Sequence, residues 1–341
     1  MASTRISAHL PPDIDVTKAP LAYGDRALPR LNRELKDEDL ITRQRALRTL
    51  CDYLHDPEHI AEALRVGVAE SLKALLPDKD GTVRHKTTEV LYILAGHNVG
   101  REAFLDHEII LPLSKLYDDQ LDIVRKNAHM AIEMVCEMPM GAAGVVEAGL
   151  VPKLVIKLRT ELDEIKEYIL DTLHFCMRVE QMQALQSGAM EVFTNLLKHE
   201  SNVIRAKAAR DIMDLSVPLD GKNRACEVDA LSALVTLLKD DDADVRCKAA
   251  GAIMTITITT QGKYQAIKAN AIPNLVMLVS DETSEVRLNT LKAITTLSEA
   301  PEGRATLLKH VDLIKKYMDE DKSEAVQRAA EIAVKVITWK P

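Results

Sequence analysis

An acidic segment near residue 80 has the residue types for binding calcium. In LPDKDGTVRHKT, Asp78, Asp80 and Gly81 occupy positions 3, 5 and 6 of a twelve-residue calcium-binding loop. Position 1 would then be a leucine and position 12 a threonine, so the first carboxylate and the bidentate glutamate are missing. A second acidic run, DDDADV, lacks the turn glycine as well. The sequence therefore predicts no calcium site.

Histidines offer a second kind of metal chemistry. His107–Glu108 and His199–Glu200 are His-Glu pairs, which iron hydroxylases built on HEAT repeats use at symmetric repeat positions. Here one pair lies 23 residues after the recurring arginine position described below and the other lies 6 before it, so they cannot be symmetry mates. His55 and His59 share the i, i+4 spacing of a zinc-binding helix, but no third ligand follows and a proline lies between them. We expect no metal and no cofactor.

Sequence signatures of common enzyme classes do not occur in the chain. It contains no P-loop, no G-x-S-x-G and no G-x-G-x-x-G. The sequence therefore disfavours an enzyme and predicts no catalytic residue, no cofactor-binding residue and no small-molecule substrate.

Composition and charge narrow the class of partner. The formal net charge is −8, from 44 Lys and Arg against 52 Asp and Glu, and no basic run stands out. This pattern argues against nucleic acid or an anionic membrane as the main partner. No stretch reaches the length of a membrane helix, and MASTRISAHLPP lacks the apolar core of a signal peptide. Five widely spaced cysteines indicate free thiols in a reducing compartment, so we expect a cytoplasmic protein.

A repeat of about 41 residues organises the chain. The segment DVRCKAAGAI returns as TVRHKTTEVL, IVRKNAHMAI, VIRAKAARDI and EVRLNTLKAI, and TRQRALRTL extends the series upstream. Lys166 fills the single gap of 80 residues between arginines, and Gln327 stands at the last position. The arginine positions are Arg43, Arg84, Arg125, Arg205, Arg246 and Arg287.

Two further columns keep the same register. Six residues before the arginine position lie Asp37, Asp78, Asp119, Asp240, Asp281 and Asp321. Sixteen residues after it lie Gly100, Gly141, Gly221, Gly262 and Gly303. We interpret the arginines and aspartates as a structural ladder between neighbouring repeats, with a binding surface as the alternative. The aspartate also suits the start of the long helix, and the glycine suits a left-handed cap or a tight corner. Asp241 and Asp242 are expected to be local surface charges.

Each unit reads as three helices, of which the last is the longest. The aromatic content is only 3%, which suits helices packed on helices. We therefore predict an all-α fold, an armadillo/HEAT-type α-solenoid of about eight repeats over residues 27–341. Residues 1–26 contain three prolines and no helical period, and are predicted to form an extended arm that becomes ordered on a partner, with a disordered tail as the alternative. The predicted repeats lie near 27–68, 69–109, 110–150, 151–189, 190–230, 231–271, 272–311 and 312–341.

The long helices supply candidate residues for binding a partner. Ile93, Met134 and Phe175 stand at one equivalent position in repeats two to four, where they could form an apolar strip in the concave groove. The alternative, which the helical spacing of apolar residues favours, is that the register is off by one and they are core residues. Nuclear-import armadillo proteins carry Trp and Asn along this helix, whereas here the equivalent positions hold neither, and Trp339 is the only tryptophan. Import-receptor function is thereby excluded.

The full-length pattern resembles one family of axonemal proteins. The stretch PPDIDVTKAPLAYGDRALPRLNREL, followed by units that end in VKVITWKP, resembles the radial spoke head 14 family, also called rhabdoid tumour deletion region proteins. The resemblance implies a non-enzymatic subunit of the radial spokes, which link outer doublet microtubules to the central apparatus in motile cilia and sperm flagella.

Partners and location follow from that resemblance. It implies a hetero-oligomeric complex with other radial spoke proteins, and a place in the cytoskeleton of the cilium and flagellum axoneme. The charge of −8 disfavours direct contact with the acidic microtubule surface. The alternative is a general cytoplasmic adaptor that binds an extended client peptide in its concave groove.

Overall fold

The computed structural model describes residues 27–340, and this part of the chain is helical without any β-strand. The all-α solenoid class predicted from the repeat is therefore confirmed. The predicted N-terminal arm, residues 1–26, and the last residue lie outside the described range. The chain divides into two compact units, 27–148 and 149–340, and each is described by itself.

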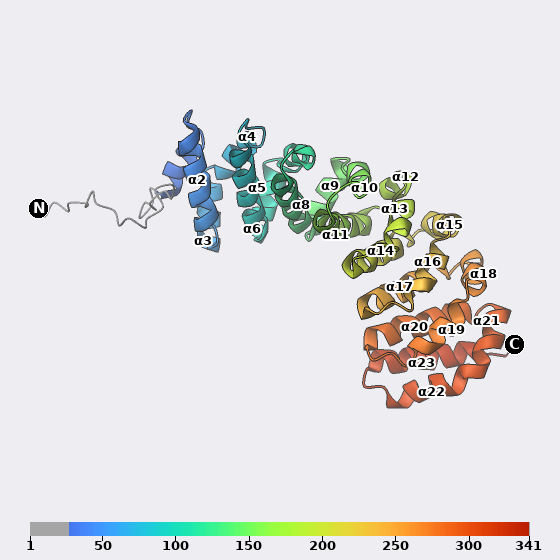
Figure 1. The fold of residues 1–341 in the computed structure, drawn as a ribbon. Helices are drawn as coiled ribbons and strands as arrows, with labels where there is room; N and C mark the ends of the chain where they lie inside the picture. The colour runs from blue at the N-terminus through green and yellow to red at the C-terminus, as the bar shows by residue number, and fades with distance from the viewer. Residues whose placement is uncertain (1–26, 341) are drawn as a thin grey trace, which may run out of the picture. The chain divides into compact units, whose positions relative to one another are not determined.

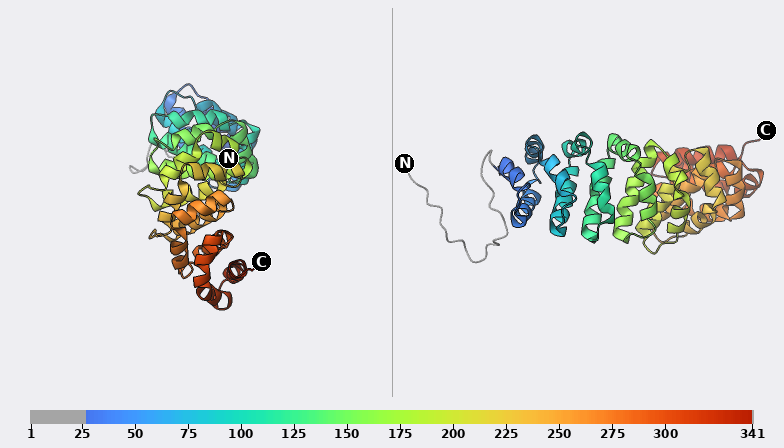
Figure 2. Two further views of the ribbon diagram at one scale, coloured as in Figure 1. Left: turned by 90° about the vertical axis from the view of Figure 1, so that its right-hand side faces the viewer. Right: turned by 90° about the horizontal axis from the view of Figure 1, so that it is seen from above.

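The first unit is a stack of short and long helices (Figure 1). Its long helices α2, α5 and α8 pack side by side in chain order, and the short helices lie between them in sequence. The view from above in Figure 2 shows the same order of helices. The bounds are α1 (Ala27–Glu34), α2 (Leu40–Tyr53), α3 (Pro57–Arg65), α4 (Val68–Leu75), α5 (Gly81–Ala95), α6 (Asn98–Asp106), α7 (Ile110–Ser114), η1 (Lys115–Asp118), α8 (Asp122–Cys136) and α9 (Pro139–Glu147).

The second unit repeats this pattern, and its long helices α11, α14, α17, α20 and α23 each pack on the next. Three of them begin at residues 202, 243 and 284, at the 41-residue interval of the arginine column. The bounds are α10 (Val151–Lys157), α11 (Asp163–Val179), α12 (Met182–Gln186), α13 (Ala189–Leu196), α14 (Asn202–Leu215), α15 (Leu219–Glu227), α16 (Ala230–Leu237), α17 (Ala243–Ile256), α18 (Thr260–Lys268), α19 (Ala271–Leu278), α20 (Ser284–Leu297), α21 (Pro301–Leu307), η2 (Leu308–His310), α22 (Val311–Glu320) and α23 (Glu324–Ile337).

The core of each unit is mainly aliphatic and receives side chains from both the short and the long helices, with Tyr117, Phe104 and Phe193 as the largest fully buried ones. In α17, for example, Val245, Ala249, Ala252, Ile253 and Ile256 are fully buried. Their spacing follows the helical period, so one stripe of the helix faces its neighbours. Because a single repeat has no partner for this stripe, burial depends on the repeats on either side.

The glycine column serves close packing of two helices. Gly221 lies in the first turn of α15, and a Cβ atom there would lie 1.8 Å from the carbonyl oxygen of Leu215, at the end of α14. Gly262 has the same relation to Ile256, at 2.3 Å. Neither glycine has a positive φ. The expectation of a left-handed cap was therefore wrong at these positions, whereas a tight corner is what the structure contains.

Left-handed backbone occurs instead between the two short helices of a repeat. Gly67, Gly149 and Gly188 have positive φ there, and Glu108, Asp229 and Asn270 adopt the same conformation. Asp and Asn are among the residue types that tolerate this region best, whereas Glu is not. Five of these six residues lie 24 positions after the arginine column, which makes them a column that the sequence analysis missed.

All five cysteines are buried free thiols. Within residues 27–340, no single helix is both long and apolar enough to cross a membrane, and α9 and α10 meet those criteria only when taken together.

Candidate functional site

The recurring arginine joins two successive interhelical loops in the second unit. Arg246 Nη1 donates to the carbonyl oxygens of Asp240 and Asp241, at 2.8 and 2.9 Å, in the loop before its own helix. Its Nε donates to Asp281 Oδ2 in the following loop, at 2.8 Å. Arg205 donates from Nε and Nη2 to the two carboxylate oxygens of Asp240. Arg287 donates in the same way to Asp321. The charged ends are mostly buried, with 18% of the Arg246 side chain and 6% of the Asp281 side chain exposed.

The first unit contains the same connection. Arg84 makes a bidentate contact with Asp119, at 2.6 and 3.2 Å, and donates to the carbonyl of Asp78. Arg43 lies 3.1 Å from Asp78 and donates to the carbonyl of Asp37. Arg125 donates to the carbonyl of Asp119 and pairs with Asp122 in its own helix, at 2.9 Å.

The fourth repeat departs from this arrangement. Lys166 replaces the arginine and contacts Asp163, three residues earlier, at 2.9 Å. His199, which stands where the next repeat would have its aspartate, lies 3.3 Å from the same carboxylate. Lys166 and His199, which stand at the arginine and aspartate positions, are therefore linked through the carboxylate of Asp163 rather than to each other.

The helix caps differ from the expectation for the acidic loop. Asp240 Oδ1 accepts the N–H of Asp242 at 3.0 Å and so shapes the turn, but it does not cap α17. Asp242 is the N-cap, accepting the N–H groups of Asp244 and Val245, and its Oδ2 also accepts from Asn202 of the preceding repeat at 2.6 Å. Describing Asp242 as a surface charge was therefore wrong. These hydrogen bonds, that of Asn202 first, lower the pKa of Asp242.

The predicted groove residues lie on the long helices but in different units. Ile93 in α5 and Met134 in α8 belong to the first unit, and Phe175 in α11 belongs to the second. All three are half-buried, so they are not part of the fully buried core. Their role in binding a partner stays a prediction.

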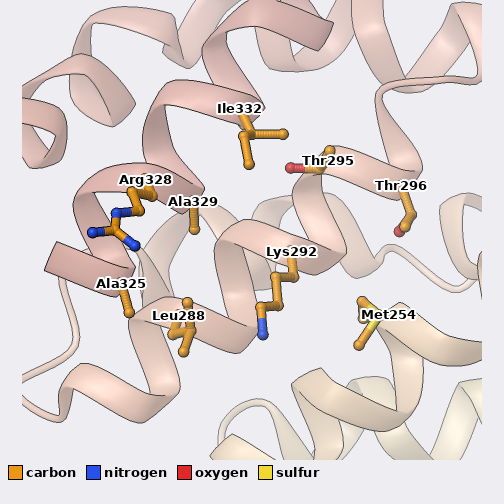
Figure 3. A pocket seen from close by; sticks show the side chains of 9 residues that line it. All are labelled: Met254, Leu288, Lys292, Thr295, Thr296, Ala325, Arg328, Ala329 and Ile332. Carbon is orange, nitrogen blue, oxygen red and sulfur yellow. The ribbon is translucent and has the colours of Figure 1, made fainter. Parts of the chain in front are cut away.

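A pocket of about 480 Å³ opens between the last three long helices (Figure 3). Leu288, Met254 and Ile332 supply apolar surface, and Ile332 is 54% exposed. Two cations complete the lining, namely Lys292 of α20 and Arg328 of α23, and none of the lining residues is acidic. Ile332 and Lys292 stand at one equivalent position of adjacent repeats, five residues after the arginine column.

The two cations differ in how they are neutralised. Arg328 pairs with Glu324 one turn earlier on α23, at 3.0 Å, with both side chains exposed. The exposed Lys292 has no ion pair within the described part of the chain. A hollow with apolar walls and an uncompensated positive charge is suited to a segment that carries both apolar and acidic side chains. Sequence reasoning missed this pocket because it looked for an apolar strip in repeats two to four.

A second site lies between α11 and α14, where six charged or titratable side chains converge. Asp171 accepts from Lys207 at 2.6 Å and from Arg210 at 2.8 Å. Arg210 also donates to Oδ1 of the fully buried Asp211, at 3.0 Å. His174 Nδ1 lies 2.6 Å from Asp214 Oδ2. Burial raises the pKa of Asp211 far above its usual value, although Arg210 opposes the shift.

The histidines singled out in the sequence do not form such a cluster. His107 lies 3.1 Å from Glu70, whereas its neighbour Glu108 is 89% exposed and lies 3.9 Å from Lys73. His59 makes a hydrogen bond with the carbonyl of Tyr53 at 3.0 Å. Within residues 27–340, the one group of three potential metal-ligating side chains is His174, Asp211 and Asp214.

Comparisons with known proteins agree with this architecture. A family model described as HEAT repeats matches residues 190–295. The chain is a HEAT/armadillo-like repeat protein. The crystal structure of an engineered protein superposes with a TM-score of 0.86 over 93% of this chain and 79% of the engineered one, at 22% identity, which speaks to the fold alone.

One relative of known name is similar in sequence over part of the chain. Radial spoke protein 14 of Chlamydomonas reinhardtii is 26% identical over 122 residues. The match covers 36% of this chain and only 31% of the relative. The chain therefore spans about a third of that protein's length.

Proposed function

We propose that this protein is a non-enzymatic scaffold subunit of axonemal radial spokes. The observation that carries the proposal is the similarity to Radial spoke protein 14, at 26% identity over 122 residues. The repeat architecture supports it, because stacked repeats present long, rigid surfaces on which several proteins can dock. In this role the protein would support the motility of cilia and sperm flagella by holding other spoke proteins in a hetero-oligomeric complex.

The pocket on α17, α20 and α23 is the surface we assign to docking. Its apolar walls and the exposed Lys292 favour a partner segment with apolar and acidic side chains. Ile93, Met134 and Phe175 are proposed as further contacts for partners. The net charge of −8 argues that attachment to the microtubule runs through other spoke subunits.

Localisation and purification from motile cilia test this function together. The tagged protein should lie along the axoneme of multiciliated cells and should co-purify with radial spoke subunits in stoichiometric amounts. Uniform cytosolic or nuclear staining, with no spoke subunit recovered, would contradict the proposal.

The second candidate is a general cytoplasmic adaptor that binds an extended client peptide. The pocket favours it, because a peptide-sized hollow with two cations can bind a client outside any axoneme. The same purification separates the two functions. The adaptor would be favoured if the purification recovered soluble clients but no spoke subunits, and if reversing the charge of Lys292 abolished the recovery of those clients.

A further inference from the structure

Three potential metal ligands come together between α11 and α14. The ligand atoms of His174, Asp211 and Asp214 all lie within 4.8 Å of one another. Asp211 and Asp214 are three residues apart on α14, so their side chains share one face of the helix. His174 comes from α11, one repeat earlier, and stacking of the two long helices brings it beside them.

The buried carboxylate of Asp211 is only half satisfied. The residue is fully buried, and its Oδ1 accepts from Arg210, but its Oδ2 has no hydrogen-bond partner in the described structure. A buried carboxylate oxygen without a partner is costly, because it has lost its water and gained nothing in exchange. A carboxylate oxygen of Asp211 lies within 4.8 Å of the ligand atoms of His174 and Asp214. A cation bound by the Asp211 carboxylate at this place would supply the missing partner.

Two cations neighbour the three ligands. Lys207 and Arg210 both bind Asp171 of α11, at 2.6 and 2.8 Å. Arg210 also contacts Asp211, whereas the carboxylate of Asp214 contacts the imidazole of His174. Arg210 fixes the orientation of Asp211 through Oδ1, in the way that outer-shell groups orient the ligands of metal sites.

The ligand types indicate which metal would bind. An imidazole together with carboxylates suits zinc and other divalent transition metals, whereas calcium and magnesium prefer oxygen ligands throughout. His174 Nδ1 and Asp214 Oδ2 lie 2.6 Å apart, a hydrogen-bond distance. Tetrahedral zinc, with bonds of about 2.0–2.1 Å, holds neighbouring ligand atoms about 3.3 Å apart, so the two side chains need to separate by less than an ångström. Both are partly exposed, and water can supply the fourth ligand.

We propose that His174, Asp211 and Asp214 form a binding site for a divalent transition metal of the zinc type. Such a metal would tie α11 to α14, and so would stabilise the joint at which the fourth repeat lacks the arginine–aspartate pair of the other repeats. The site is independent of the radial spoke function proposed above.

Cobalt binding to the untagged full-length protein tests the proposal. The protein would be stripped of metal with a chelator, dialysed and titrated with Co²⁺ by calorimetry and by visible spectroscopy. We expect one equivalent to bind and to raise the thermal midpoint, as any ligand of the folded state does. The spectrum should lack a thiolate-to-cobalt charge-transfer band, because the five cysteines are buried away from solvent.

Two variants and one matched control locate the bound metal. His174→Ala and Asp214→Asn each alter a partly exposed ligand, so both should fold, which circular dichroism can verify. Each should weaken binding at least about tenfold, since even the loss of a second-shell partner costs a metal site about 10–100-fold. His199→Ala is the control, because His199 is equally half-buried and contacts a carboxylate at 3.3 Å but has no third ligand. Absence of binding by the wild type, equal loss in the control, or a thiolate band would overturn the proposal.

Discussion

Arg246 and Asp281 are 35 residues apart in sequence, yet Nε of Arg246 lies 2.8 Å from Oδ2 of Asp281 in the structure. The guanidinium group of Arg246 also holds two carbonyl oxygens of its own loop. One side chain therefore joins the backbone of one loop to the carboxylate of the next. A planar group with five donors can do both at once, which an ammonium group cannot.

Replacing this arginine should destabilise the second unit. We expect Arg246→Lys to lower the free energy of unfolding by about 1.5–3 kcal/mol, the range for a hydrogen bond to a charged group that is left unsatisfied. The control is Lys248→Ala in the same helix, whose pair with Asp244 is more exposed and should contribute at most about 1 kcal/mol. Urea unfolding followed by circular dichroism measures both. Equal effects of the two changes would mean that the arginine does not join the loops.

Acid should weaken the joint between Arg287 and Asp321. The hydrogen bond from Arg287 holds the pKa of Asp321 below its ordinary value of 3.8. A carboxyl whose pKa is lower in the folded state stabilises the fold above its unfolded pKa and loses that contribution as the pH falls through the folded value. We expect Asp321→Asn to be clearly less stable than the wild type near neutral pH, and the difference to shrink between about pH 5 and about pH 2. A difference independent of pH would contradict this account.

The glycine column should not accept a methyl group. In Gly221→Ala the new Cβ would overlap the carbonyl oxygen of Leu215, so α15 must move away from α14. We expect a loss of about 1–3 kcal/mol, as for other overpacked sites. Gly149→Asn is the control, because nothing lies near its Cβ position and Asn270 adopts the same left-handed conformation in a later repeat. Thermal unfolding should show a large shift for the first change and a small one for the second.

Reversing one charge in the pocket should impair docking without affecting the fold. Lys292→Glu places an acidic group among the lining residues, where it would repel an acidic partner segment. We expect an unchanged thermal midpoint and a loss of co-purifying partners. Lys309→Glu is the matched control, since this exposed lysine lies outside the pocket. Undiminished recovery of partners with Lys292→Glu would exclude the pocket as their binding surface.

The thiols should be inert while the protein is folded. Burial raises the pKa of Cys51 to about 12, so almost no thiolate forms at physiological pH. Iodoacetamide should therefore leave Cys51 unmodified in the native protein and label it once urea unfolds the chain, as mass spectrometry of the peptides can show. Rapid labelling under native conditions would mean that this part of α2 opens readily.

The sequence alone determined the fold class, because a helical pattern with a period of about 41 residues can bury its apolar faces only by stacking repeat on repeat. It also identified the arginine and aspartate columns, whose recurrence is visible without coordinates. The sequence misjudged Asp242. An N-cap aspartate and an exposed surface aspartate look alike in a sequence, and they differ only in the hydrogen bonds that they make. The reason why glycine recurs in its column was also not visible in the sequence. It is the short distance between the glycine and the carbonyl oxygen at the end of the preceding helix.

Only the tertiary structure revealed the two candidate sites. His174 and Asp214 are 40 residues apart, and neither belongs to a recurring column or a local motif. Their proximity follows from the stacking of α11 on α14, which places residues one repeat apart side by side. The pocket around Lys292 arises in the same way, from three long helices that are far apart in sequence. A residue pair separated by about one period is the signal that could have indicated the histidine site. Burial of Asp211 could not be inferred from it, because burial depends on every side chain packed around that carboxylate.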